Sequence, residues 1–324
     1  HRQHTQGLPP RSRAAELHPH ADEIEIDAGW SIEIPADAGP GLATAGAELQ
    51  RYLKDAMNVD VAVNRPKRLG DWRDRRRVIV AAAREDMPGC GDRLKASKDY
   101  RIQVSGDAIA VCGFDDRGAT YGLYNLIMRF RLREAPYLPR NLDTVRHSLY
   151  QARITLSGLG WMEWPDRYLA TLPLYGFDAI HCSIYRNPNN APGSEPHWSD
   201  RDIRKHPPGA MKDLIQRAAR FGIDVYAPLL YQSTGTPENI DGLRTLVREV
   251  VTEFPEIRGY VLLTEGFYYK KWFGAGGQGD EDLRAWVREW AKAVAIAAEE
   301  AHKINPKLEI LPWEYNVAFS PDQA

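Results

Sequence analysis

The feature that most constrains the fold is a regular alternation of strand and helix patterns beyond residue 148. Apolar segments rich in β-branched and aromatic residues are separated by amphipathic segments, several of which end at glycine. Such alternation predicts βα units arranged around a parallel sheet. The expected strands are residues 148–159, 178–185, 223–231, 257–265 and 308–319, and the expected helices are residues 166–177, 210–222, 239–255 and 281–304.

Two architectures accommodate this pattern, a TIM-type (β/α) barrel and a doubly wound sheet. A complete barrel needs about 250 residues, whereas roughly 175 follow the first domain, enough for about five strands. A doubly wound sheet fits this length. Its usual glycine-rich phosphate turn, however, does not follow any expected strand, and AGGQG (275–279) lies about ten residues past one. We therefore expect a barrel truncated after about five strands, completed by a remaining C-terminal segment or covered at its open edges in a homodimer.

The sequence before the barrel predicts a separate α+β domain. Residues 1–22 are polar and resemble a loose leader, residues 23–145 form the expected small domain, and residues 146–324 form the barrel domain. In the small domain the expected strands are residues 23–35, 59–63, 77–83 and a hairpin over 100–114, and the expected helices are residues 41–57 and 115–130.

The charge composition bears on whether nucleic acid or a membrane is expected as a partner. The 324 residues carry a formal net charge of −2, so there is no electrostatic reason to expect nucleic acid or an anionic membrane as a partner. An apolar run of about 18 residues, as a membrane span requires, does not occur. The chain begins without Met or an apolar signal region, as a processed form would, and we expect a secreted or periplasmic protein. We interpret Cys90, Cys112 and Cys182 as small buried residues, because they match no metal spacing.

Functional groups of a βα barrel gather where the strands end. The expected strand ends here carry aromatic rings that can stack on a sugar, together with amides and charged groups that can bind hydroxyls. An alternative is that loop starts are simply polar and that aromatic residues cap the barrel mouth. The candidate substrate-binding residues are Trp161, Trp164, His181, Arg186, Asn187, Tyr231, Gln232, Trp313 and Tyr315.

Glu265 is the best candidate for proton chemistry. It follows a strand that is apolar at nearly every position, and partial burial raises a carboxyl pKa towards the range of a general acid. Glycosidic cleavage needs such an acid and a second carboxylate, for which Glu163 and Glu314 are candidates. Glu265 could instead be a solvated residue or pair with Lys270, and the tryptophans beside Glu163 and Glu314 fit a stacking site equally well.

Other chemistries fit the sequence less well. His181 and Cys182 are adjacent on an expected strand, so their side chains point to opposite faces and cannot form one dyad. The sequence has no G-x-S-x-G elbow. Its histidines are scattered, so we expect no metal site. We also expect no cofactor, because positioned acid and base groups suffice for glycosidic cleavage.

Three segments resemble known glycosidases. GFDDRGATYGLYNLI (113–127) resembles the motif that closes the small α+β domain of exo-acting family 20 hexosaminidases and family 67 α-glucuronidases. IRGYVLLTEGF (257–267) and LEILPWEYNVAF (308–319) resemble the fourth and fifth barrel strands of family 67. The resemblance implies that Glu265 is the catalytic acid.

The chain departs from both families at specific positions. Family 67 has a lysine where this chain has Val261 and an arginine where it has Glu314, and both cations would pair with a uronate. Family 20 has an Asp-Glu pair where this chain has Thr264-Glu265. The resemblance implies an exo-glycosidase acting on a poly- or oligosaccharide. The alternatives are a non-catalytic carbohydrate-binding protein on the same fold, a β-N-acetylhexosaminidase-like enzyme, and a structural half-barrel that dimerises.

Overall fold

The chain forms two compact units. The computed structural model describes residues 12–156, 164–182, 210–229, 237–263 and 280–313. The first unit comprises residues 1–154, 164–178 and 216–223, and the second comprises residues 155–163, 179–215 and 224–324. Chain segments therefore cross from one unit to the other several times, and the expected boundary at residues 145–146 stays a prediction.

The first unit contains a six-stranded sheet in the order β3-β2-β4-β6-β5-β8 and a separate pair, β1-β7. Strands β3, β2, β4 and β6 run parallel, and β5 is antiparallel to β6 and β8. The strands are β1 (Glu23–Glu25), β2 (Ser31–Glu33), β3 (Ala62–Asn64), β4 (Val78–Ala83), β5 (Tyr100–Ser105), β6 (Ala108–Gly113), β7 (Tyr137–Pro139) and β8 (Asp143–Arg146). The helices are α2 (Pro40–Met57), α3 (Asp116–Arg133) and α4 (Asp166–Thr171), with 3-10 turns η1 (Trp72–Asp74) and η2 (Pro173–Tyr175).

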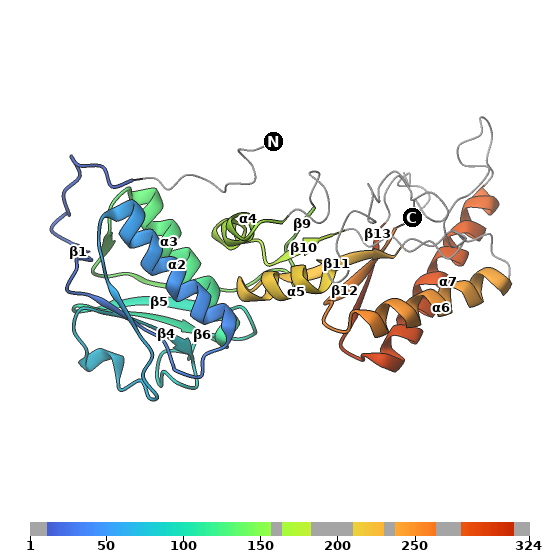
Figure 1. Ribbon diagram of the computed structural model, residues 1–324, viewed down its shortest axis with the longest axis horizontal. Helices are drawn as coiled ribbons and strands as arrows, with labels where there is room; N and C mark the ends of the chain where they lie inside the picture. The colour runs from blue at the N-terminus through green and yellow to red at the C-terminus, as the bar shows by residue number, and fades with distance from the viewer. Residues whose placement is uncertain (1–11, 157–163, 183–209, 230–236, 264–279, 314–324) are drawn as a thin grey trace. The chain divides into compact units, whose positions relative to one another are not determined.

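This sheet is covered on both faces. Helices α2 and α3 lie side by side over one face (Figure 1), where Leu49, Leu123 and Ile109 belong to one large apolar cluster. Trp72 and Met87 belong to a second cluster with alternate residues of β4 and β6. Every residue of β4 and β6 is buried, which explains their continuous apolar sequences.

The motif 113–127 has a structural role in this unit. Asp115 caps α3 by accepting a hydrogen bond from Gly118 N at 2.8 Å. A Cβ atom at Gly118 would lie 2.1 Å from the Asp99 carbonyl oxygen, and one at Gly113 would lie 2.1 Å from Ala119 N. The two glycines thus allow the start of α3 to pack directly on the backbone of the sheet.

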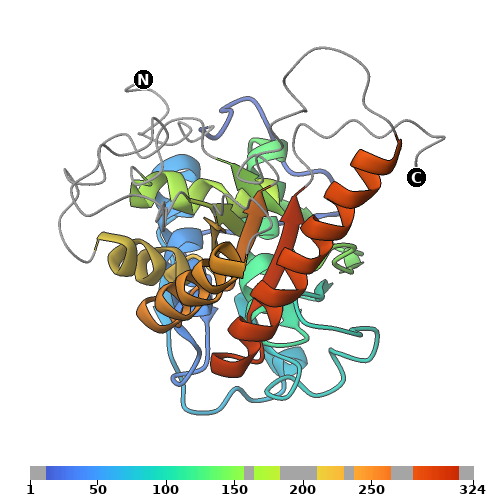
Figure 2. The ribbon, with the colours of Figure 1, turned by 90° about the vertical axis from the view of Figure 1, so that its right-hand side faces the viewer.

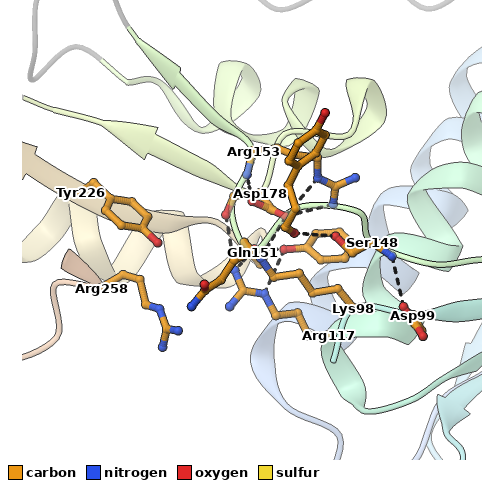
Figure 3. Close-up of polar contacts among 12 residues, drawn as sticks. Lys98, Asp99, Arg117, Ser148, Gln151, Arg153, Asp178, Tyr226 and Arg258 are labelled. Carbon is orange, nitrogen blue, oxygen red and sulfur yellow. Dashed lines mark hydrogen bonds and ion pairs between the residues drawn. The ribbon is translucent and has the colours of Figure 1, made fainter. Parts of the chain in front are cut away.

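A buried carboxylate organises the polar contacts of the first unit (Figure 3). Asp178 is fully buried, and its carboxylate accepts hydrogen bonds from Lys98 Nζ at 3.1 Å and Arg153 Nη2 at 2.9 Å. Arg117 Nη2 donates to the carbonyl oxygens of Asp178 at 3.4 Å and Gly222 at 3.3 Å. These bonds join the residues before β5, helix α3, the segment after β8 and the chain around Asp178 and Gly222 within one unit.

The second unit contains a five-stranded sheet in the order β13-β12-β11-β10-β9, parallel from β10 to β13. Its helices α6 and α7 lie side by side (Figure 2). The strands are β9 (Ile154–Leu156), β10 (Ala179–His181), β11 (Asp224–Leu229), β12 (Gly259–Leu263) and β13 (Glu309–Trp313). The helices that alternate with them are α5 (Ala210–Arg220), whose residues from Gln216 onward are counted with the first unit, α6 (Pro237–Glu253) and α7 (Asp280–Ile304). The predicted order of strands and helices is confirmed.

Candidate functional site

The five-stranded sheet has one face covered by helices. Cys182 Sγ lies 3.7 Å from Met211 Sδ on α5, and the Tyr260 hydroxyl donates to the Val250 carbonyl on α6 at 2.9 Å. Side chains alternate along a strand, so His181 and Val261 point to the opposite face. The expectation that His181 and Cys182 cannot form one dyad is therefore confirmed.

That opposite face is concave. The rings of His181 on β10 and Trp313 on β13 lie 6.1 Å apart between centroids and meet edge to face at 88°. Two strands separate β10 from β13, which would put these rings about 14 Å apart on a flat sheet. The sheet must therefore curl as a barrel wall does, with both rings on its inner side and at the last residues of their strands. The structure thus brings together two predicted substrate-binding residues.

His181 is a buried side chain whose polar atoms are unsatisfied among the described residues. It is 7% exposed, and neither ring nitrogen has a hydrogen-bond partner among the residues that the structure describes. Burial lowers the pKa of His181 to about 4, so the ring is neutral at pH 7. A neutral imidazole offers one donor and one acceptor, which is what a sugar hydroxyl can use.

A group that sequence reasoning missed lies at the beginning of β12 and β13. The Tyr226 hydroxyl donates to Glu309 Oε2 at 2.6 Å, and Arg258 donates to Glu309 Oε1. Figure 3 shows Tyr226 and Arg258. Burial and the bond to Glu309 raise the pKa of Tyr226. A Cβ atom at Gly259 would lie 2.9 Å from the Tyr226 ring, so glycine lets this ring reach across β12. The sequence feature that could have indicated this group is Gly259, a glycine at the start of a strand whose other residues are bulky.

Trp164, a third predicted residue, belongs to the first unit. It is 1% exposed, and its ring packs against Tyr168 with centroids 5.5 Å apart. Its carbonyl accepts a hydrogen bond from Arg217. These contacts bury the Trp164 ring, and its role in substrate binding stays a prediction.

The remaining predicted residues lie outside the described ranges. They include all three candidate carboxylates and most of the expected loop residues. They are Glu163, Glu265, Glu314, Trp161, Arg186, Asn187, Tyr231, Gln232 and Tyr315.

Two features are absent from the part of the chain that the structure describes. Within those ranges, no three or more His, Cys, Asp and Glu side chains gather in a way that could hold a metal ion. Likewise, the described helices include none that is long and apolar enough to cross a membrane.

Comparison with solved structures identifies the class of fold. A family 20 β-N-acetylhexosaminidase from Streptomyces coelicolor superposes with a TM-score of 0.53 at 14% identity, covering 95% of this chain and 70% of that one. A Streptomyces plicatus β-hexosaminidase bound to its product superposes with a TM-score of 0.58 at 12% identity, covering 95% and 67%. A family 115 4-O-methyl-α-glucuronidase superposes with a TM-score of 0.55 at 13% identity, covering 89% and 42%.

These likenesses concern the fold. No protein-family model and no curated protein matches the sequence. The expected architecture, a small α+β domain followed by part of a TIM-type barrel, is confirmed, as is the resemblance of its fold to that of exo-acting glycosidases.

Proposed function

We propose that this chain is a glycoside hydrolase, or part of one, that cleaves glycosidic bonds with Glu265 as the general acid. The observation that carries the proposal is the meeting of His181 and Trp313 on the concave face of the curled sheet. This is the end of a barrel sheet at which active sites are built. The solved structures that share the fold are glycosidases, which supports the same reading.

In the proposed mechanism Glu265 donates its proton to the oxygen of the leaving sugar. Glu163 or Glu314 supplies the second carboxylate, either as nucleophile or as the base that activates water. Neutral His181 binds a sugar hydroxyl, and Trp313, 38% exposed, offers its ring face to the sugar. In the sequence Glu265 lies an even number of residues after Val261, so continued strand alternation is the basis for expecting it on the concave face.

The described residues favour a neutral sugar over a uronate at this site. Val261 faces the concave side, at the position where family 67 enzymes carry a lysine. An apolar side chain cannot pair with a uronate carboxylate. A neutral sugar is therefore the substrate class that we propose.

The test compares Glu265→Gln with the wild type on glycosides that have different leaving groups. We expect kcat/KM on nitrophenyl glycosides to fall roughly 10²- to 10⁴-fold, because the leaving group is no longer protonated. The kcat/KM on dinitrophenyl glycosides should fall much less, because their leaving group departs with little need for protonation. Glu256→Gln, an exposed carboxylate just before β12, is the matched control and should keep full activity.

Two outcomes contradict the proposal. Equal activity of the Glu265→Gln and Glu256→Gln variants would remove Glu265 from the mechanism. Glycan binding by the wild type without turnover of any glycoside would instead identify a carbohydrate-binding protein on a glycosidase fold.

A further inference from the structure

We propose that the first unit carries a separate binding site for a sugar that bears a carboxylate or sulfate group. The site is a pocket of about 280 Å³ lined by residues of β5, α3, the end of β8 and the turn η2. All of its lining residues belong to the first unit. The proposal concerns neither Glu265 nor the concave face of the barrel sheet, and it stands or falls independently of the proposed hydrolase activity.

The pocket gathers more positive than negative charge. Lys98, Arg146 and Arg153 line it, and Arg129 donates from Nε to Oδ1 of the lining residue Asn125 at 3.0 Å. Two buried carboxylates lie against the lining: Asp178 accepts hydrogen bonds from Lys98 and Arg153, and Asp99 contacts the lining residue His147. Four cations against two carboxylates leave an excess of positive charge for an anion to neutralise.

Two of the cations are already held in place. The buried Asp178 carboxylate binds Lys98 Nζ and the Arg153 guanidinium, and the Lys98 ammonium also donates to the Gln151 carbonyl (Figure 3). Ordering long side chains before a ligand arrives lowers the entropic cost of binding. Lys98 and Arg153 therefore form a preorganised wall of the pocket.

Arg146 is the cation that remains available. It is exposed at the end of β8 and makes no ion pair with any residue that the structure describes. Its strand register places it opposite Tyr100 on β5, whose ring also lines the pocket. The planar guanidinium fork matches the geometry of a carboxylate or sulfate.

The positive charge of the pocket affects the pKa values of two neighbouring side chains, Arg129 and Tyr100. Burial, and then the positive charge of Arg146, lower the pKa of Arg129 below its ordinary value. Burial raises the pKa of Tyr100, while the cations Arg146, Arg129 and Arg153 act in the opposite direction. Three guanidinium groups thus act electrostatically on one phenol, and a bound anion would offset their positive charge.

The uncharged lining indicates a sugar rather than a bare ion. Tyr100, Tyr121 and Tyr175 contribute phenol rings, and the Tyr175 side chain is 53% exposed. Asn125 adds an amide that can bind a hydroxyl. The volume is close to the lower end for small-molecule pockets and suits a single monosaccharide unit. The anionic group would contact Arg146, with the ring of the sugar against the tyrosines.

The experiment is a calorimetric titration of the full chain with glucuronate, glucose 6-sulfate, neutral glucose and sodium sulfate. We expect both anionic sugars to bind at least tenfold more tightly than glucose and sodium sulfate, with an affinity that weakens as salt is added. Arg146→Ala should weaken their binding at least tenfold and Arg146→Lys less. Arg140→Ala, which removes another exposed arginine, 3.8 Å from Asp107, should leave it unchanged.

Three results would overturn the proposal. Binding of sodium sulfate as tight as that of the charged sugars would assign the pocket to a free oxyanion. Equal affinities of the Arg146→Ala and Arg140→Ala variants would place the ligand elsewhere. Absence of binding by either charged sugar to the wild type would remove the site. Circular dichroism melts of each variant establish that it is folded before titration.

Discussion

At the residue scale, the burial of neutral His181 makes the stability of the folded chain depend on pH. Its folded-state pKa of about 4 lies below the value of about 6.5 for an unperturbed histidine, because burial penalises the charged ring. The unfolded chain therefore binds a proton at a higher pH than the folded chain does. The stabilising contribution of neutral His181 is fully present above pH ~6.5 and is lost as pH falls towards 4.

We predict that His181→Phe removes this part of the pH dependence. Between pH ~6.5 and 4 the free energy of unfolding of the wild type should fall by up to about 3 kcal/mol more than that of the variant. Above pH ~7 the two curves should run parallel. Urea unfolding followed by circular dichroism at a series of pH values measures the difference. An imidazole NMR signal of His181 that titrates near pH 6.5 would contradict the burial argument.

At the element scale, strong local signals located most helices and strands. The helix expected over residues 281–304 is observed as Asp280–Ile304, and the hairpin expected over 100–114 is observed as β5 and β6 around Gly106, whose φ is +57°. Both elements are determined by residues close together in the sequence. Helical periodicity predicts the helix, and the turn residues predict the hairpin.

Elements that depend on distant partners were predicted less well. Residues 23–35 were expected as one strand, but a turn at Asp27 separates β1 from β2, and β1 pairs with β7 near residue 138 instead of joining the main sheet. Strand β8 was not expected. It is short and largely polar, and only its pairing with β5 defines it.

Two glycines in helices should respond in opposite ways to alanine. Gly118→Ala places a methyl group 2.1 Å from the Asp99 carbonyl oxygen, and we expect a loss of about 1–3 kcal/mol in the free energy of unfolding. Gly242→Ala on α6 meets nothing within 4 Å and should gain about 0.5–1 kcal/mol from helix propensity. Thermal melts of the two single variants provide the measurement. A neutral Gly118→Ala would mean that α3 does not need this close approach.

At the scale of the whole molecule, sequence reasoning indicated which strand ends carry functional groups but not how they meet. His181 and Trp313 were selected as aromatic or polar residues at strand ends. Their contact depends on the curl of a sheet in which β11 and β12 lie between them. Curl is a property of the assembled strands, so no local pattern reports it. The bond between Tyr226 and Glu309 joins strands on either side of β12, and its one local trace in the sequence is Gly259, which leaves room for the Tyr226 ring.

Each of the two units contains at least one buried cysteine, so thiol reactivity can be used to follow the unfolding of each unit separately. All three thiols are free and buried, as expected from the sequence. Cys90 and Cys112 belong to one apolar cluster beneath β4 and β6, whereas Cys182 lies between β10 and α5 in the second unit. Burial raises the pKa of the Cys182 thiol to about 12, and its neighbour Cys90 and burial raise the pKa of Cys112.

Thiol labelling should therefore resolve the unfolding of the two units. In the native protein near pH 8 we expect labelling at least about 100-fold slower than in denaturant, because reaction requires opening of the unit that buries the thiol. As urea rises, Cys90 and Cys112 should become reactive together because they share one cluster, and Cys182 should follow its own transition. Peptide mass spectrometry after a labelling pulse separates the three sites. A single transition common to all three thiols would show instead that the two units unfold as one cooperative body.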